Sequence, residues 1–197
     1  MSDTSLSILS VVGSLHGSSV TRDVILDLNA RLSGLGCTCD TLDLSVEKLD
    51  LLNPDTSYSQ PGYADLKKRV QTADVLLLGT PDYHGSMSGA LKNFFDHFWK
   101  EFAGKLFAPI VASHEKGLTV TDQVRTVARQ CYAWSMPYAM SFVEKQDVGE
   151  GRILNEVFEK RLEMFARDIE VYGRLLSIQR KADLKGSDSG FMARYRA

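Results

Sequence analysis

The chain has 197 residues, of which 44% are hydrophobic and 24% are charged, the composition of an ordinary globular protein with one sizeable core. Its formal net charge of -2 at pH 7 gives no reason to expect nucleic acid or an anionic membrane as a partner. No apolar run is long enough to cross a bilayer, and the first residues, MSDTSLS, lack the features of a targeting peptide. Three cysteines, an odd and low count, then favour a cytoplasmic protein with free thiols.

The first predicted unit is a strand, a loop rich in glycine and hydroxyl groups, and a helix. Ser5 to Val12 is apolar toward its end, and the loop 13–19 (GSLHGSS) leads into an amphipathic helix that runs to about Leu32. Backbone amides at such a helix start favour an anion. The loop fits neither a Walker A sequence nor a dinucleotide fingerprint, and its neutral donors suit a monophosphate. A capped helix without any ligand explains this loop equally well.

The second unit contains two of the cysteines. Residues 37–44 (CTCDTLDL) alternate and predict a strand on which Cys37 and Cys39 share a face. A zinc site would need a second pair of ligands, which the sequence lacks, so we predict structural thiols and no metal. A long loop with turn signals follows at 45–62, and a short helix at 63–73.

The stretch 75–99 is the most informative in the chain. Val75 to Gly79 predicts a buried strand, which we expect Pro81 to stop because proline lacks a backbone donor. A loop with two glycines comes next, and Ser88 to Trp99 predicts an aromatic helix with a serine cap. In an open α/β sheet, ligands bind on loops such as this one, at the carboxyl ends of the strands.

The remaining elements continue the alternation of strand and helix. We expect a strand at 106–112, a loop at 113–118, a helix at 121–132, a strand at 137–143 and a closing helix at 153–178. The polar segment 181–197 has no clear period, and we expect it to be a mobile tail, unless Phe191, Met192 and Tyr195 contact another subunit.

This order predicts a single α/β domain over residues 1–180. Five alternations argue for a three-layer fold in which helices cover both faces of a five-stranded parallel sheet. With a phosphate loop after the first strand, the flavodoxin-like strand order 2-1-3-4-5 is the best choice.

Two motifs in these loops resemble those of the NADPH-dependent FMN reductase family, which includes flavin, quinone, azo and chromate reductases of flavodoxin-like fold. The motifs are Gly13-Ser14-Leu15-His16 with Ser19-Val20-Thr21, and Pro81-Asp82-Tyr83-His84-Gly85-Ser86 followed by Gly89-Ala90-Leu91-Lys92-Asn93 with Asp96. The resemblance implies non-covalent FMN, NADPH or NADH as reductant, a two-step hydride exchange, and a homodimer or homotetramer.

Carried over by position, the resemblance also implies the binding residues. The FMN phosphate would be held by Ser14, His16, Ser19, Val20 and Thr21. The isoalloxazine would be lined by Pro81, Asp82, Tyr83, His84, Gly85 and Ser86, largely through backbone groups, with Ser113 in a third loop. No catalytic acid or base is expected, because hydride transfer is the chemistry of the cofactor.

The chain departs from the family pattern in two of these loops. His16 stands where the family commonly has arginine, and a histidine that is mostly neutral near pH 7 predicts weaker or pH-dependent phosphate binding. The third loop has His114, Glu115 and Lys116 where the family usually has glycines. His114 and Lys116 either attract the adenosine phosphate of NADPH or belong to a solvated loop.

Several further roles stay open. Tyr83 flanks the ring or is an interface aromatic, and His84 donates a proton or contributes only its backbone. The aromatic helix faces a second subunit or only the core, and Asp96 and Arg22 are interface contacts or surface charges.

Three functions are compatible with these observations. The first is an enzyme that passes electrons from a nicotinamide through FMN to a small-molecule acceptor, namely a quinone, an azo compound, a metal oxyanion or free flavin. The second is a flavodoxin-like electron carrier, which the small net charge does little to support. The third is a binding module whose flavin site has decayed.

Overall fold

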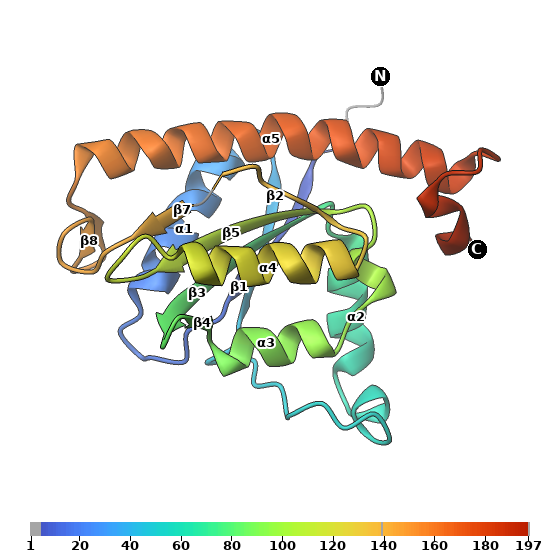
Figure 1. Ribbon diagram of the computed structural model, residues 1–197, viewed down its shortest axis with the longest axis horizontal. Coiled ribbons are helices and arrows are strands. Elements are labelled where there is room, and N and C mark those ends of the chain that lie inside the picture. The colour runs from blue at the N-terminus through green and yellow to red at the C-terminus, as the bar shows by residue number, and fades with distance from the viewer. Residues whose placement is uncertain (1–4, 139, 197) are drawn as a thin grey trace.

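A computed structural model describes residues 5–138 and 140–196. The expectation on targeting rests partly on residues 1–4, which lie outside the described residues, as do position 139 in the predicted fifth strand and the last residue of the predicted tail. The described chain forms three layers, with one sheet between two layers of helices (Figure 1). None of its helices is long and apolar enough to cross a membrane.

The main sheet has the order β2-β1-β3-β5-β6, with β7 also beside β5 and the short β4 beside β3. Its strands are β1 (Ser7–Val12), β2 (Thr38–Asp43), β3 (Val75–Tyr83), β4 (Ser86–Met87), β5 (Leu106–Ala112), β6 (Trp134–Ser135) and β7 (Met140–Phe142). All pairs are parallel except β3–β4. The flavodoxin-like class is therefore confirmed. Two details differ from the prediction. Within the predicted fifth strand, 137–143, the structure has only β7, and the separate short strand β6 pairs with β5 just before that range. In addition, β4 forms an antiparallel hairpin with β3.

Helices cover both faces of this sheet. The helices are α1 (Val20–Gly34), α2 (Tyr63–Thr72), α3 (Gly89–Asp96), α4 (Leu118–Gln130) and α5 (Glu156–Lys185), with short 3-10 turns η1 (Ser57–Ser59), η2 (Lys100–Phe102) and η3 (Phe191–Tyr195). A small hairpin of β8 (Val148–Gly149) and β9 (Arg152–Ile153) precedes α5. Apolar residues of α1 and α5 share one core cluster, and those of α2, α3 and α4 share the other.

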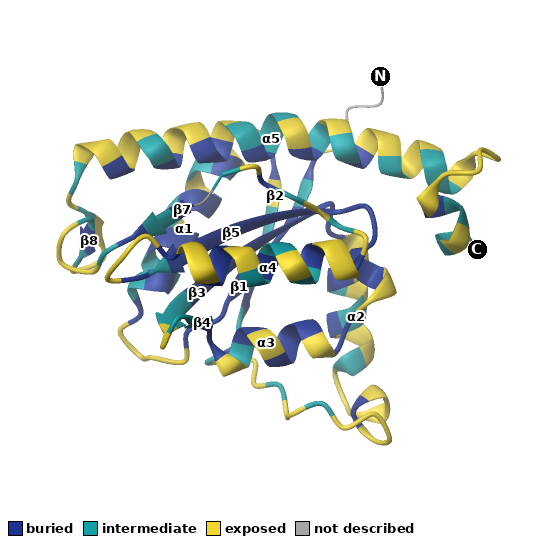
Figure 2. Cartoon of the chain, viewed as in Figure 1, coloured by how far each residue is buried: buried dark blue, intermediate teal, exposed yellow. Residues whose placement is uncertain are grey.

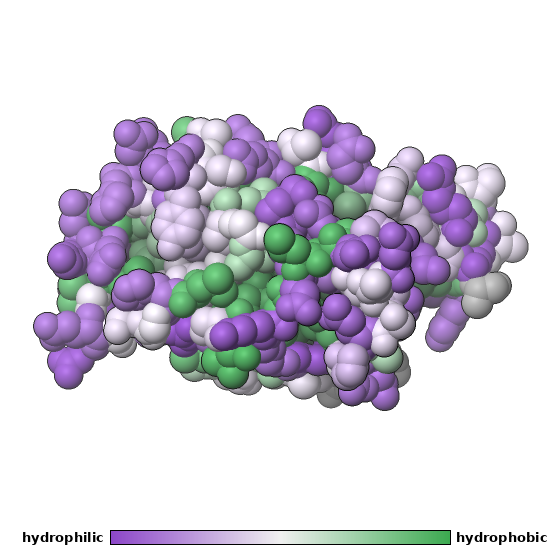
Figure 3. All heavy atoms as spheres, turned by 90° about the horizontal axis from the view of Figure 1, so that it is seen from below, coloured by the Kyte–Doolittle hydropathy of each residue, from purple (hydrophilic) through white to green (hydrophobic). Residues whose placement is uncertain are grey.

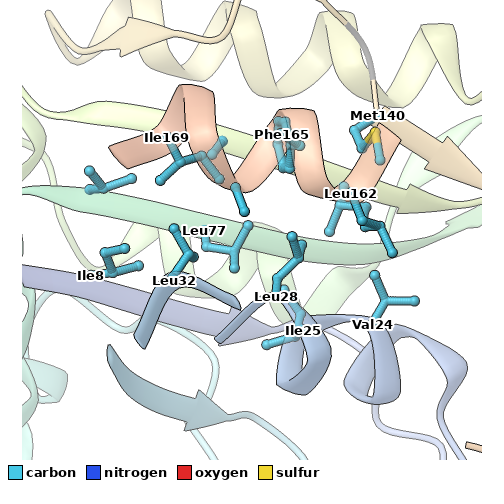
Figure 4. Packing of buried hydrophobic residues seen from close by; sticks show 14 of the residues in the cluster. Ile8, Val24, Ile25, Leu28, Leu32, Leu77, Met140, Leu162, Phe165 and Ile169 are labelled. Atoms are coloured by element: carbon cyan, nitrogen blue, oxygen red, sulfur yellow. The ribbon is translucent and has the colours of Figure 1, made fainter. Parts of the chain in front are cut away.

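The pleat of the strands divides the core in two. Ile8 and Leu77 point to the side of α1 and α5, whereas their chain neighbours Leu9 and Leu76 point to the other side. Figure 4 shows the first cluster, in which Phe165 of α5 lies over the sheet. Strands buried on both faces explain the continuous apolar runs in the sequence (Figure 2).

Pro81 does not end β3, contrary to the prediction. Gly79 O accepts a 2.8 Å hydrogen bond from Gly13 N, which lies just after β1. Residues two apart on a strand direct their backbone groups to the same side, so the nitrogen of Pro81 also faces the β1 side. The β1–β3 register ends at Gly79, and no ladder hydrogen bond is lost there. The strand can therefore continue to Tyr83.

The boundaries of two helices also differ from the prediction. α3 ends at Asp96 instead of Trp99, whose side chain is 66% exposed. α5 continues to Lys185, so the predicted tail begins as helix. Beyond it η3 packs on the same chain, where Met192 is 1% exposed.

Candidate functional site

The carboxyl ends of β1, β3, β5 and β7 meet at one edge of the sheet, and a cavity of about 290 Å³ opens there. This edge includes the point between β1 and β3 at which the strand order reverses, where ligands bind in open α/β folds. The cavity is lined by Ser14, His16, Ser18, Ser19, Val20, Thr21, Pro81, Asp82, Tyr83, Ala112, Ser113, His114 and Glu144.

The first wall of the cavity is the loop 13–19 with the start of α1. Ser19 caps the helix, and its Oγ accepts a hydrogen bond from Arg22 N at 3.2 Å. The amides of Val20 and Thr21, in the first helical turn, have no intrahelical acceptor. The helix dipole adds partial positive charge at the same place. This wall is therefore suited to an anion.

Thr21 provides a second observation for the same ligand chemistry. The residue is 1% exposed, lines the cavity, and packs its methyl group close to Gly79. Its hydroxyl has no hydrogen-bond partner among the residues that the structure describes. Since no fully buried side-chain N or O among the described residues lacks a partner, this hydroxyl reaches the cavity, where it can donate to a ligand that supplies acceptors, as a phosphate does.

The second wall is the hairpin between β3 and β4. His84 and Gly85 form its two-residue turn, and both have positive φ angles (58° and 75°), as a type I′ turn requires. Gln123 of α4 fixes this turn from outside. Its Nε2 donates to Gly85 O at 3.2 Å, and its Oε1 accepts from Ser86 Oγ at 3.1 Å. The hairpin thus presents Asp82 and Tyr83 to the cavity on a rigid support.

The third wall follows β5 and β7. Ser113 is 7% exposed, and its Oγ donates to Asp82 Oδ2 at 2.9 Å, so the second and third walls are joined. His114 and Glu144 complete this side. The cavity therefore combines neutral donors at the α1 end with a tyrosine and two carboxylates elsewhere.

The structure brings nine of the predicted site residues to this cavity and leaves three outside its lining. Those at the cavity are Ser14, His16, Ser19, Val20, Thr21, Pro81, Asp82, Tyr83 and Ser113. Of the other three, His84 is exposed at the turn, Gly85 N donates to Asp82 Oδ1, and the Ser86 side chain is directed to Gln123.

Four residues at or behind the cavity were not predicted from the sequence, namely Ser18, Ala112, Glu144 and Gln123. Glu144 follows directly after the predicted fifth strand, so its place at a carboxyl end was a usable signal. Gln123 had no such signal, because α4 meets the hairpin only through tertiary packing. Among the described residues, no group of three or more histidine, cysteine or acidic side chains is arranged to hold a metal ion.

Fold and cavity together define a flavodoxin-like α/β protein with a site for an anionic ligand at the reversal point of its sheet. The chain belongs to the NADPH-dependent FMN reductase family, whose model matches residues 6–147. This confirms the family, its oxidoreductase class, and FMN and NADPH as the family's cofactor and reductant.

Two curated relatives are similar to this chain. An FMN-dependent NADPH-azoreductase of Staphylococcus haemolyticus (strain JCSC1435) is 27% identical over 174 residues, which cover 82% of this chain and 92% of the relative. An FMN-dependent NADPH-azoreductase of Staphylococcus aureus (strain USA300) is 34% identical over 94 residues, or 45% of this chain. That match spans half the length of the Staphylococcus aureus relative.

Solved structures share the fold. The flavoenzyme NAD(P)H:(acceptor) oxidoreductase FerB from Paracoccus denitrificans superposes with a TM-score of 0.72 at 20% identity, covering 86% of this chain and 98% of FerB. The apo form of the NADH:FMN oxidoreductase EMOB gives 0.70 at 21% identity, covering 85% and 90%. A flavodoxin from Streptococcus pneumoniae TIGR4 gives 0.58 at 16% identity, covering 86% and 99%.

Proposed function

We propose that this chain is an NAD(P)H-dependent oxidoreductase that binds FMN in the cavity at the strand ends and passes electrons to a small-molecule acceptor. The acceptor would be a quinone, an azo compound, a metal oxyanion or free flavin. The observation that carries the proposal is the convergence of three loops on one cavity, with the start of α1 at one end. The azoreductase relatives support an acceptor of this range.

The α1 end of the cavity fits the phosphate of FMN. The amides of Val20 and Thr21 and the Thr21 hydroxyl would donate to it, with the hydroxyls of Ser14 and Ser19 close by. His16 would add a donor that depends on its protonation, where the family commonly has a permanent arginine charge.

The hairpin side fits the flavin ring. Asp82 and Tyr83 line the cavity from β3, and Ser113 holds the Asp82 carboxylate in place. When bound, FMN supplies the hydride chemistry, and the chain supplies position and electrostatics. Because no side chain is needed as acid or base for that transfer, we assign no catalytic residue. Tyr83, 53% exposed, would cover one edge of the ring.

A second copy of the chain is the proposed protein partner. A groove of about 1120 Å³ between α2, α3, η2, α4 and η3 is lined by aromatic and charged side chains, among them the exposed Trp99. Figure 3, which views the molecule from the α3 side, shows apolar side chains gathered on this face. A two-fold dimer would place the same face of a second copy on this groove and so cover the exposed Trp99 ring. Trp99→Ala should shift sedimentation toward a monomer, and an unchanged sedimentation coefficient would contradict this assembly.

The test of the proposed activity begins with the purified protein and added FMN. We expect flavin fluorescence to be quenched at a one-to-one ratio, with FMN bound more tightly than riboflavin. Under anaerobic conditions NADPH should then bleach the flavin absorbance, and an added quinone should restore it. Absence of FMN uptake would overturn the proposal, and bleaching by a protein partner but not by either nicotinamide would favour an electron carrier.

The site substitution that sharpens this test is Thr21→Val, which keeps the shape and removes the hydroxyl. It should weaken FMN binding by about fivefold, the effect of one lost hydrogen bond of about 1 kcal/mol, and leave riboflavin binding unchanged.

A cytoplasmic location is the last part of the proposal. All three cysteines are free thiols, which supports it.

A further inference from the structure

Arg22, in the first turn of α1, lies against the outer side of the loop 13–19. Its guanidinium donates to Gly17 O at 2.9 Å and to His16 O at 3.4 Å. It is not among the residues that line the cavity. The sequence suggested a surface or interface charge at this position, but the side chain instead contacts the backbone of its own chain.

Asp43, at the end of β2, holds the guanidinium in this position. Arg22 Nε donates to Asp43 Oδ2 at 2.5 Å, and Arg22 Nη2 donates to Ser45 Oγ at 2.8 Å. Asp43 Oδ1 accepts from Ser45 N at 2.9 Å. Burial raises the pKa of Asp43, but the hydrogen bonds from Arg22 and Ser45 outweigh it, so the pKa lies below its ordinary value.

These contacts determine how two peptide groups of the loop are turned. A trans peptide directs its N–H opposite to its C=O. Because the carbonyls of His16 and Gly17 face Arg22, the amides of Gly17 and Ser18 face away from it. His16 Nδ1 lies 3.2 Å from Ser18 N and 3.0 Å from Ser18 O, so either tautomer of the imidazole bonds to the Ser18 backbone, which orients the ring as well. A loop with glycines at 13 and 17 has little rigidity of its own.

We propose that Arg22 and Asp43 form a clamp that orders the loop 14–19 for the phosphate of FMN and so sets the preference for FMN over riboflavin. Arg22 acts here as a positioning residue, because its charge is neutralised by Asp43 and its donors are used by carbonyls, Ser45 and the carboxylate. This inference rests on the proposed function and deepens it. The ligand group that it concerns is the phosphate monoester of the flavin.

The test compares two ligands in four proteins. FMN and riboflavin are titrated into wild type, Arg22→Met, Arg22→Lys and Arg69→Gln by flavin fluorescence, and thermal midpoints are recorded. Arg22→Met should raise the Kd for FMN by about tenfold, equivalent to 1.4 kcal/mol, and leave the Kd for riboflavin within about twofold. Arg22→Lys should behave like Arg22→Met, because an ammonium cannot bridge a carboxylate and two carbonyls in the planar arrangement of a guanidinium.

Arg69→Gln is the matched control. Arg69 also forms a two-point pair with a carboxylate of β2, with Nε to Asp40 Oδ2 at 2.7 Å and Nη2 to Asp40 Oδ1 at 2.9 Å. It also donates to the carbonyl of Thr41 at 2.9 Å and lies outside the cavity lining. Its loss should change neither ligand's Kd, even if the thermal midpoint falls.

The outcomes separate this inference from the proposed function. If wild type binds neither flavin, the proposed function fails. If wild type prefers FMN and Arg22→Met prefers it equally, only the clamp is overturned. An equal rise in the Kd for FMN and for riboflavin in Arg22→Met would mean that Arg22 merely supports the fold. Restored preference in Arg22→Lys would mean that the residue contacts the phosphate as a charge, and both of these results would overturn the clamp.

Discussion

Ser113 Oγ donates a 2.9 Å hydrogen bond to Asp82 Oδ2 and so joins the end of β5 to the hairpin that follows β3. The other oxygen of the same carboxylate accepts from Gly85 N at 2.8 Å, across the turn of that hairpin. One carboxylate thus holds the two loops on which the flavin ring would rest. Its two bonds are made within the chain, which argues for a structural rather than a chemical task.

Asp82→Ala should therefore weaken the binding of FMN and of riboflavin to a similar degree, because both ligands contain the isoalloxazine ring. The loss of binding free energy should amount to about 1.5 to 3 kcal/mol, the range for hydrogen bonds to a charged group. Ser113→Ala removes one of the two bonds and should have the smaller effect. Fluorescence titrations measure both, and a loss confined to FMN would show that Asp82 acts at the phosphate end instead.

His16→Arg should strengthen FMN binding. An arginine offers a permanent charge and a planar set of donors, whereas His16 Nδ1 already contacts Ser18 O at 3.0 Å. We expect a Kd for FMN lower by about tenfold at low salt and by less at high salt, since screening weakens the added charge. Riboflavin serves as the control ligand, and an equal gain for riboflavin would contradict this explanation.

Gly79→Ala should destabilise the protein at the contact between β3 and α1. An added Cβ would lie 2.9 Å from Thr21 Cγ2 and 2.9 Å from Ile25 Cγ1, closer than packed carbon atoms allow. Such overpacking costs about 1 to 3 kcal/mol. Gly17→Ala is the control, because its Cβ would meet nothing within 4 Å. Urea unfolding measures both, and equal midpoints would mean that α1 can shift freely away from the sheet.

The stability of the fold should also rise with pH above neutrality through Lys105. Its buried ammonium donates to the carbonyls of Val70, Gln71 and Ala73 at the end of α2. Burial lowers the pKa of Lys105 to about 7 from 10.5. At pH values between these two pKa values, the unfolded state binds more protons than the folded state, so the unfolding free energy increases with pH.

The increase should be at most about 1.4 kcal/mol per pH unit, the limit for one proton. Lys105→Met should remove this pH dependence. In parallel urea titrations, the unfolding free energy of the wild type relative to the variant should therefore rise from pH 7 to pH 10. The carboxylates of Asp74 and Glu101 oppose the shift, and Arg180 and Lys181 add to it. Parallel pH profiles for the two proteins would mean that Lys105 stays charged throughout this range.

Much of the fold could be predicted because apolar runs and glycine-bearing loops are local. The run at 75–79 and the serine at 88 predicted a buried strand and a capped helix, and the structure has both, with Leu91 N donating to Ser88 Oγ at 3.1 Å. The end of β3 was predicted wrongly. Whether Pro81 loses a ladder bond depends on where the neighbouring strand ends, which no local pattern records.

The length of α5 was also underestimated, for a related reason. The part that was missed, 179–185 (QRKADLK), is mostly polar and has no apolar stripe. Arg180 Nε donates to Ala103 O at 2.8 Å, and Arg196 Nε donates to Asp183 O at 2.8 Å. These contacts come from other parts of the chain, so they follow from the fold and not from the periodicity of the helix.

The sequence by itself determined the alternation of strands and helices, the loops at the strand ends and the residue types suited to a phosphate and a flat ring. Periodicity and turn residues act over a few positions, so they can be recognised in the sequence alone. Only the tertiary structure decided that nine of those residues surround one cavity, that Gln123 supports the hairpin, and that Arg22 is held by Asp43. These contacts arise where separate elements meet, because parallel strands bring their ends together only after the sheet has formed.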